Sequence, residues 1–150
     1  MAEALLRQTL LDSHVNWTDV TSGGLVASHW GVAHSQLRRV LGQTYKLVEN
    51  RRSKPLTTDL VASSSLILGM EDRHVNQILE RFPTAEGRVD KITSYAGRDG
   101  EIRDFPDSEY GDVFSWLQHC HSIMTPCIEI IAQKIIREQD RHVDSPGKLD

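Results

Sequence analysis

The chain has 150 residues, a hydrophobic fraction of 39%, a charged fraction of 25% and a formal net charge of −4. These values are typical of one soluble globular domain, and no long run of Lys or Arg suggests a surface for nucleic acid or for an anionic membrane. The first residues lack a cationic stretch followed by an apolar run, and no apolar window reaches the length of a membrane span. We therefore expect a cytoplasmic protein with neither nucleic acid nor membrane as a partner, whereas its oligomeric state stays open.

The first part of the chain predicts a helix, a strand and a second helix. Apolar residues on one face predict an amphipathic helix from Met1 to about Ser13, and this helix begins without an N-cap residue. Alternating β-branched and aromatic residues predict a strand over Trp17–Ser22, which ends in Gly23-Gly24. Ser35–Leu41 should form a short helix that Gly42 closes.

The middle of the chain alternates between strand and helix patterns. Thr57 or Thr58 can cap a short helical turn, and the apolar run Ser64–Met70 predicts a strand buried on both faces of a parallel sheet. A helix should follow over Asp72–Phe82, before a second strand candidate over Val89–Tyr95. This alternation predicts an α/β fold, with a parallel sheet and flanking helices.

The last third predicts one long amphipathic helix from about Val113 to Arg137. Pro126 should kink or split this helix, because proline removes a helical hydrogen bond. The polar residues 139–150 predict a frayed tail, so we expect a single domain over residues 1–138.

The two cysteines, Cys120 and Cys127, lie seven residues apart in this predicted helix. Two helical turns separate them by ~10 Å, which is too far for a disulfide. The nearby His119 and His121 invite a metal site, but residues at i and i+2 point apart, and no CxxC or HxxxH spacing is present. We therefore predict no metal site.

Five segments, taken in order, carry a more specific signal. They are Met1-Ala2-Glu3, Thr21-Ser22-Gly23-Gly24-Leu25, Arg51-Arg52-Ser53-Lys54-Pro55-Leu56-Thr57, Leu66-Ile67-Leu68-Gly69-Met70 followed by Glu71 and His74, and Phe105-Pro106-Asp107-Ser108-Glu109-Tyr110-Gly111-Asp112.

In this order the segments resemble the low-molecular-weight protein tyrosine phosphatases, from Met1 to about Lys134. Family members place a strand and a Cys-x5-Arg-Ser-Pro loop before a helix that commonly opens Met-Ala-Glu. The resemblance therefore implies the phosphotyrosine phosphatase I type of α/β fold, in a chain that begins just after the catalytic loop and lacks the first strand.

The resemblance also implies a chemistry. In the family a cysteine thiolate attacks phosphorus, loop amides and an arginine stabilise the equatorial oxygens, and an aspartic acid protonates the leaving group. Asp107 is the residue we assign to the acid, because Tyr110-Gly111 follows it as in the family. Asp104 is a competing alignment, and a simple capping role for Asp107 is the structural alternative.

Other roles follow from the same resemblance. Tyr110 and Trp30 would lie at the substrate rim, although plain packing is the better explanation of Trp30. The partner would be a phosphorylated protein or a small phosphate ester, and neither a cofactor nor a metal is implied. Phosphotyrosine, phosphoarginine and small esters cannot be separated, because the loop residues that choose among them are absent.

The nucleophile is also absent, because neither Cys120 nor Cys127 begins a Cys-x5-Arg motif. We therefore predict that the chain as written is inactive. A start codon placed too late in a phosphatase gene is the first explanation, and a non-enzymatic binding or regulatory descendant is the second. An arsenate reductase is less favoured, because no cysteine lies between Met70 and Tyr95.

The missing strand has a predicted cost for stability. In the family it lies between the strands that correspond to Trp17–Ser22 and Ser64–Met70, so both would have an unpaired edge. We predict a marginally stable or aggregation-prone chain, which a cooperative melt of a monomer would contradict.

Overall fold

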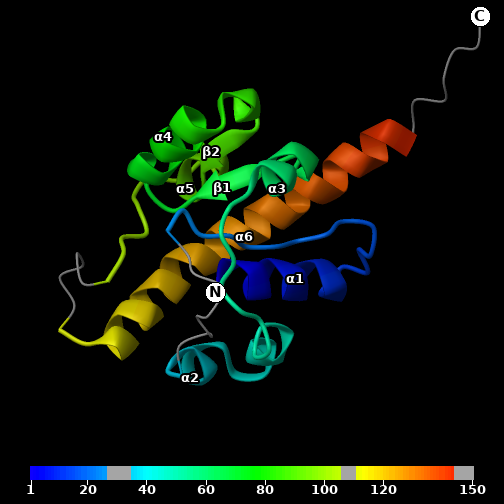
Figure 1. The fold of residues 1–150 in the computed structure, drawn as a ribbon. Helices are drawn as coiled ribbons and strands as arrows, with labels where there is room; N and C mark the ends of the chain where they lie inside the picture. The colour runs from blue at the N-terminus through cyan, green and yellow to red at the C-terminus, as the bar shows by residue number, and fades with distance from the viewer. Residues whose placement is uncertain (27–34, 106–110, 144–150) are drawn as a thin grey trace, which may run out of the picture.

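The computed structural model of the chain describes residues 1–26, 35–105 and 111–143 (Figure 1). Among the described residues no helix combines the length and the apolar character that a membrane crossing requires. In chain order the elements are α1 (Ala2–Asp12), α2 (Leu37–Leu41), η1 (Gly42–Leu47), α3 (Thr58–Ser63), β1 (Ile67–Gly69), α4 (Asp72–Arg81), η2 (Pro83–Ala85), β2 (Val89–Lys91), α5 (Ile92–Tyr95) and α6 (Val113–Val143).

The sheet of the described residues consists of β1 and β2, which run parallel. Ile67 pairs with Val89, and Gly69 pairs with Lys91. Helix α4 connects the two strands, so the unit is a β–α–β crossover. The expected α/β fold, with a parallel sheet and flanking helices, is confirmed.

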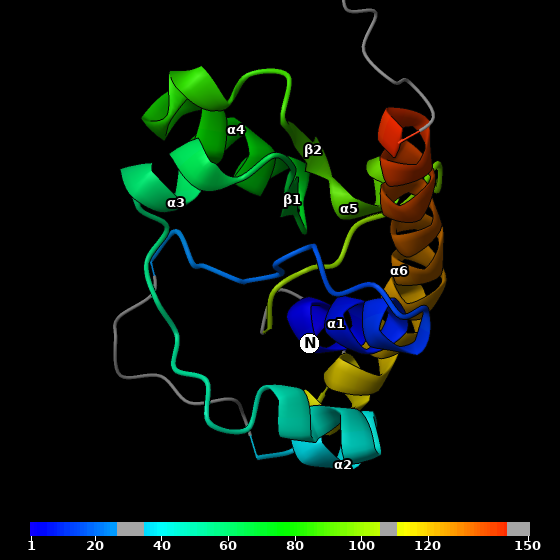
Figure 2. The same cartoon turned by 90° about the vertical axis from the view of Figure 1, so that its right-hand side faces the viewer.

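Helices cover both faces of this small sheet. Figure 2 shows α3 and α4 on one side of the strands and α6 on the other. Ile67 packs with the cluster that α3 and α4 form around Val61 and Ile78, whereas Leu68 packs with the cluster on α6. Successive residues of β1 therefore enter opposite cores, as the strand predicted to be buried on both faces requires.

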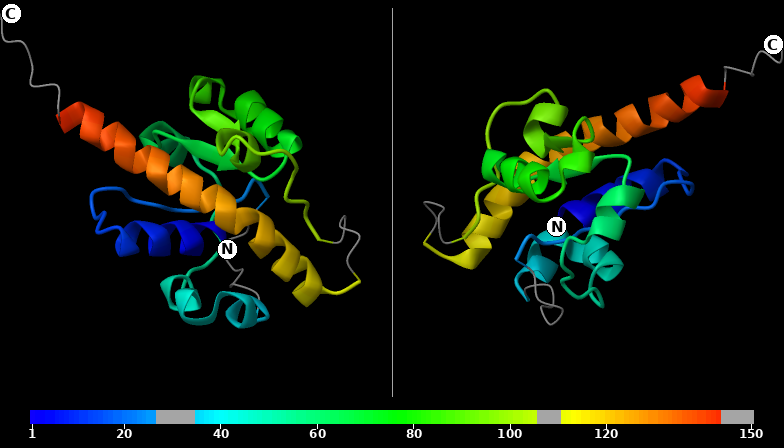
Figure 3. Two further views of the ribbon diagram at one scale, coloured as in Figure 1. Left: turned by 180° about the vertical axis from the view of Figure 1, so that it is seen from behind. Right: turned by 45° about the horizontal axis from the view of Figure 1, so that its top comes forward.

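Helix α6 supplies most of the larger core. Figure 3 shows it crossing the whole molecule, with α1 and α5 beside it. The cluster on α6 includes Ile131 and Cys127, both 0% exposed, and Ile92 of α5, which is 1% exposed. Burial of such side chains contributes about 2 kcal/mol each. Helix α1 therefore packs against α6, the helix that also covers one face of the sheet.

The prediction of a strand over Trp17–Ser22 is wrong. Trp17 is a bend and residues 18–22 have no regular secondary structure, and in the described part of the chain they belong to no ladder. The nearest pairing is a single parallel bridge between Gly24 and Pro55. Side chains of α1 hold the segment instead, since Arg7 donates to the carbonyl of Val20 and the Ser22 hydroxyl donates to Glu3. An alternating pattern gives an extended chain, but a strand needs a neighbour with free backbone groups.

The second half of the predicted strand Val89–Tyr95 is also wrong. Only Val89–Lys91 is a strand, and Ile92–Tyr95 turns into the short helix α5. Ile92 and Thr93 are 1% and 0% exposed, because the helical turn places them under α6. Tertiary packing has therefore overridden the strand preference of these β-branched residues.

The predicted strand Ser64–Met70 is shorter in the structure. Ser64 is the C-cap of α3, so the ladder covers only Ile67–Gly69. The capping prediction for this helix is confirmed, since Thr57 Oγ1 accepts a hydrogen bond of 3.2 Å from the amide of Leu60. Gly42 closes α2 with a φ of 55°, which favours glycine.

Helix α6 is one uninterrupted element, so of the two outcomes predicted at Pro126, a kink or a split, the split does not occur. Residues on both sides of the proline, including Met124 and Ile128, are buried in the same cluster, so both halves of the helix pack against one core. The helix also continues to Val143, past residue 138 where we placed the end of the domain.

Candidate functional site

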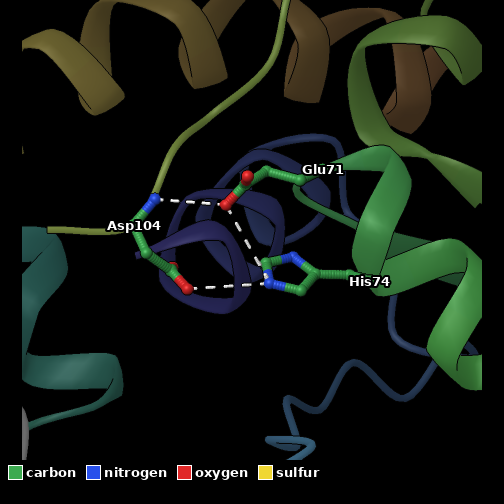
Figure 4. Close-up of side chains that lie close together, drawn as sticks. All are labelled: Glu71, His74 and Asp104. Carbon is green, nitrogen blue, oxygen red and sulfur yellow. Dashed lines mark hydrogen bonds and ion pairs between the residues drawn. The ribbon is translucent and has the colours of Figure 1, made fainter. Parts of the chain in front are cut away.

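The site lies where the C-terminal end of β1 and the first turn of α4 meet residues 101–105. Figure 4 shows Glu71, His74 and Asp104 gathered there, with the two acidic side chains facing the imidazole. Gly69 makes the approach of α4 possible, because a Cβ at this position would lie only 3.3 Å from the Cβ of His74. Charged side chains at the carboxyl end of a parallel strand are where α/β proteins commonly place a ligand site.

Glu71 is the centre of the cluster and is only 8% exposed. Its Oε1 accepts hydrogen bonds from Arg73 Nη2 at 2.9 Å and from the amide of Asp104 at 3.2 Å. Burial raises the pKa of Glu71, but the bonds from Arg73 and the Asp104 amide, together with the charges of Arg73 and His74, outweigh burial and lower it. Glu71 is therefore a carboxylate at neutral pH.

Asp104 carries the exposed carboxylate of the cluster, with its side chain 58% exposed. Its Oδ2 lies 3.2 Å from Arg73 Nη2 and 3.6 Å from His74 Nε2. His74 Nε2 is also 4.0 Å from Glu71 Oε1. The imidazole is thus beyond hydrogen-bond distance of both carboxylates, whereas Arg73 bridges them directly.

Three polar contacts fix the backbone of this site. The amide of Ile102 donates to the carbonyl of Met70, 3.1 Å away. Glu101 Oε1 accepts from the amide of Asp72 at 3.2 Å, while Glu71 accepts from the amide of Asp104. Glu71 occupies the N-cap position of α4 but makes no side-chain cap there. We call this arrangement, in which Glu101 caps α4 and Glu71 binds Asp104, the cap exchange.

Aromatic packing supports the same segment from the side of α6. Trp116 Nε1 donates a 2.7 Å hydrogen bond to the carbonyl of Arg103, and the rings of Trp116 and Phe105 lie 5.8 Å apart. Since Arg103 and Phe105 flank Asp104, the long helix helps to hold the segment that carries the exposed carboxylate.

The start of α1 packs near the segment that carries Asp104. Met1 packs in the same clusters as Trp116, whose indole Nε1 donates to the carbonyl of Arg103. In Figure 4, α1 is the dark blue ribbon drawn in the background of the cluster. The positive end of a helix dipole favours anions at such a place.

Two carboxylates and one imidazole, with their donor atoms within 4.8 Å of one another, form a group that could hold a metal ion. A second feature of the site opposes this use. Arg73 Nη2 lies 2.9 Å from Glu71 and 3.2 Å from Asp104, so a cation already bridges the two acidic groups. A divalent ion would have to displace this guanidinium. We therefore interpret the cluster as an ion-pair network.

The residues expected from the sequence fall into two groups. Asp107 and Tyr110 belong to residues 106–110, and Trp30 belongs to residues 27–34, so all three lie outside the described residues. Asp104, the competing alignment for the acid, lies in the cluster. Cys120 and Cys127 are buried free cysteines on α6.

In the sequence, Glu71 and His74 stand out only through the resemblance, and no pattern marks Arg73 as a site residue. One signal was available: charged residues follow directly after the buried strand β1. Arg51, which the sequence offered only as part of the resemblance, has its Nε 3.7 Å from Oε1 of the buried Glu3. Only the folded chain shows that these distant residues meet.

Comparison with solved structures shows the fold of a low-molecular-weight phosphatase. The arginine phosphatase YwlE from Geobacillus stearothermophilus is 26% identical, with a TM-score of 0.77, and 94% of this chain and 86% of that chain are covered. A YwlE mutant from Bacillus subtilis is 25% identical, with a TM-score of 0.76 and coverage of 89% and 87%. The tyrosine phosphatase Wzb from Escherichia coli, in complex with sulphate, is 23% identical, with a TM-score of 0.71 and coverage of 89% and 87%.

The family assignment is direct. The sequence model described as low molecular weight phosphotyrosine protein phosphatase matches residues 1–142, and the chain belongs to this family. No curated protein matches the sequence.

Proposed function

We propose that this domain serves phosphate-monoester hydrolysis in a form of the protein that carries the catalytic loop of the family, and that the 150 residues alone do not turn over. Family membership supports the reaction class. The observation that carries the proposal is the position of Asp104, whose amide is held by Glu71 at the first turn of α4, after the C-terminal end of β1. The family reaction needs an acid beside the phosphoryl group.

In this proposal Asp104 is the general acid. Attack of a cysteine thiolate on phosphorus forms an S–P bond, and the electron pair of the breaking ester bond goes to the leaving group. Asp104, protonated before this step, supplies the proton that the leaving group takes up and becomes a carboxylate. Water then cleaves the S–P bond, and the Asp104 carboxylate accepts a proton from that water. The thiolate and arginine come from a Cys-x5-Arg loop, which the 150 residues do not contain.

Asp107 remains the alternative for the acid, with Tyr110 and Trp30 at the substrate rim. The choice of Asp104 is supported by its contacts with Glu71 and Arg73. Replacing each aspartate by asparagine in an active form separates the two assignments. The acid variant should lose about 10²–10³ of its rate on phosphates with poor leaving groups, whereas the other should retain most of its activity.

Two substrate classes are proposed, phosphotyrosine and phosphoarginine in proteins, with small esters as in vitro substrates. The printed names of the similar structures include both arginine and tyrosine phosphatases. A phosphotyrosine peptide and a phosphoarginine peptide, compared at equal concentration, would separate these classes by kcat/KM. We keep the cytoplasm as the proposed location.

The test begins with the chain as it stands. We expect no hydrolysis of p-nitrophenyl phosphate by residues 1–150, and turnover would contradict the proposal. The nucleotide sequence before the Met1 codon is then read. In-frame codons for an apolar strand and Cys-x5-Arg-Ser-Pro predict that the longer product is active and that Cys→Ser in its loop abolishes turnover.

A second candidate is a regulatory or binding module without chemistry. The absence of a Cys-x5-Arg motif within the 150 residues favours it. A stop codon directly before Met1, or an upstream sequence without the motif, would support this candidate over hydrolysis.

A further inference from the structure

The segment that carries Asp104 has little regular structure of its own. Residues 98–104 form neither helix nor strand, and the Asp104 side chain is 58% exposed. An exposed aspartate in an irregular segment would ordinarily sample several rotamers. The contacts from the first turn of α4 oppose this freedom.

Glu71 provides the contact to the backbone. Its carboxylate is buried and accepts from the Asp104 amide at 3.2 Å instead of capping its own helix. Glu101 supplies the side-chain acceptor that α4 would otherwise lack, since it accepts from the Asp72 amide. The two bonds fix the register between α4 and residues 101–104.

Arg73 provides the contact to the side chain. Its Nη2 lies 2.9 Å from Glu71 Oε1 and 3.2 Å from Asp104 Oδ2, so it ties the carboxylate of Asp104 to that of Glu71. The Arg73 side chain is 47% exposed. An exposed ion pair adds little to stability, so the contact matters chiefly for the direction of the Asp104 carboxylate.

We propose that Glu71 and Arg73 are positioning residues: Glu71 holds the Asp104 backbone, and Arg73 holds the Asp104 carboxylate in one rotamer at the edge of the site beside the start of α1. This inference rests on the proposed function, in which Asp104 is the acid. A proton donor must lie within hydrogen-bond distance of its acceptor. Holding Asp104 in one rotamer lowers the entropic cost of reaching this geometry. His74, at 3.6 Å, lines the other side of the same carboxylate.

The experiment uses the 150-residue chain and NMR, and needs no catalysis. Three-bond Hα–Hβ couplings of Asp104 report its χ1 rotamer. We expect one dominant rotamer in the parent chain and averaged couplings in Arg73→Gln. Arg73→Lys should give an intermediate result, because an ammonium group can hold Asp104 but does not offer the planar fork of arginine.

Backbone positioning is measured separately, as the exchange rate of the Asp104 amide with solvent. Glu71→Ala should raise this rate about tenfold, since a charge-assisted hydrogen bond is lost. Glu71→Gln keeps an oxygen acceptor and should raise the rate much less. The Glu71 carboxyl titration gives a third readout: its pKa should rise in Arg73→Gln, because a principal cause of the lowered value has been removed.

Asp72→Asn is the matched control. Asp72 lies between Glu71 and Arg73 in sequence, but its carboxylate pairs with Lys91 at 3.0 Å. The substitution keeps the amide that Glu101 accepts from, so the Asp104 couplings and amide exchange should stay at the parent values. A change as large as that in Arg73→Gln would mean that any disturbance of the first turn moves Asp104.

Unchanged Asp104 couplings in Arg73→Gln, or couplings already averaged in the parent chain, would overturn the proposal. If the chain aggregates at NMR concentrations, an active longer form provides the second measurement. Arg73→Gln should then lower kcat/KM, which reports the leaving-group step, for phenyl phosphate at least tenfold more than for 2,4-dinitrophenyl phosphate, whose leaving group needs no proton. Equal losses on both substrates would overturn it. Where the NMR couplings can be measured, absence of activity in a longer form would contradict the proposed function alone, and the couplings would still decide whether Arg73 positions Asp104.

Discussion

The sequence pattern of Trp17–Ser22 and that of β1 both predict a strand, but only β1 is one, and different forces hold the segment Trp17–Gly23 and β1. β1 forms a ladder with β2 and enters cores on both faces. Trp17–Gly23 belongs to no ladder among the described residues and depends on side chains of α1, chiefly Arg7 and Glu3. The contrast shows that side-chain contacts alone can hold a segment in place without a backbone ladder. It also predicts that the two regions respond differently to substitution.

The largest expected effect is in the core on α6. Ile131→Ala should lower the free energy of unfolding by about 4 kcal/mol, because Ile131 is 0% exposed and the change leaves a cavity. Val20→Ala, in the segment Trp17–Gly23 where Val20 is half-buried, should cost only about 1 kcal/mol. Urea denaturation measures both. Equal losses would show that the segment is packed as firmly as the core, and the comparison would fail.

The next effect is a loss of stability at alkaline pH that originates in the α6 core. Burial raises the pKa of Cys120 to about 11, so the unfolded chain releases this proton at lower pH than the folded chain. Stability should therefore fall as pH rises from about 9 to 11, by about 2 kcal/mol from this group. Burial also raises the pKa of Tyr95, in the same direction.

The Cys120→Ala variant isolates this contribution. Its stability should decline less between pH 9 and 11 than that of the parent chain, as measured by thermal melts across the range. Parallel pH profiles would show that the thiol ionises freely in the folded chain, and that the α6 core is open to solvent.

An effect of similar size tests the anchor of the segment Trp17–Gly23. Glu3 is 7% exposed and accepts from Arg7 Nε at 3.1 Å and from the Ser22 hydroxyl at 2.5 Å. Glu3→Ala should cost about 2 kcal/mol, since both donors lose their acceptor while Arg7 is partly hydrated. Asp19→Ala, which removes an exposed carboxylate 3.5 Å from Arg7, should cost less than about 0.5 kcal/mol.

Tryptophan emission, to which Trp17 contributes together with Trp30 and Trp116, is a second readout of the same change. Trp17 is 49% exposed and lies at the start of the segment. If Glu3→Ala leaves both the tryptophan emission and the unfolding free energy at the parent values, then Glu3 is not the anchor.

The smallest effect lies at the turn that leads into this segment. His14 has a φ of 58°, a conformation that costs a side chain with a Cβ about 1 kcal/mol. His14→Gly should relieve this cost but add freedom to the unfolded chain, for a net gain of about 0.5 kcal/mol. His14→Ala should be destabilising or neutral. A loss with glycine would show that the imidazole makes a contact worth more than the strain.

The fold could be predicted where a local signal decides the structure. The amphipathic pattern of α1 and the hydroxyl cap of Thr57 act within a few residues, and both are confirmed. The prediction of a strand at Trp17–Ser22 was wrong because a strand needs a neighbouring strand to pair with, and the local sequence does not show whether one is present. Ile92–Tyr95 failed because α6, distant in sequence, determines which conformation buries Ile92. The predicted marginal stability and aggregation remain a prediction.

The candidate site was only partly predictable for the same reason. Asp104 was considered as the alternative to Asp107, from neighbouring residues alone. Its contacts with Glu71 and Arg73 join residues more than 30 positions apart, at sequence separations of 33 and 31. No periodicity connects such positions, so the network becomes visible only when the chain is folded.

The cap exchange has a consequence for how the sequence can drift. Glu101 caps the N-terminus of α4 in place of Glu71, and Glu71 accepts a hydrogen bond from the amide of Asp104. If a related chain loses Glu101, the side chain at position 71 is needed to cap α4. The amide of residue 104 then loses its acceptor, and the segment that carries it becomes free to move. Relatives of this chain should therefore show correlated substitutions at positions 71 and 101, and an insertion between β2 and residue 101 should be inherited only with a compensating change in the first turn of α4.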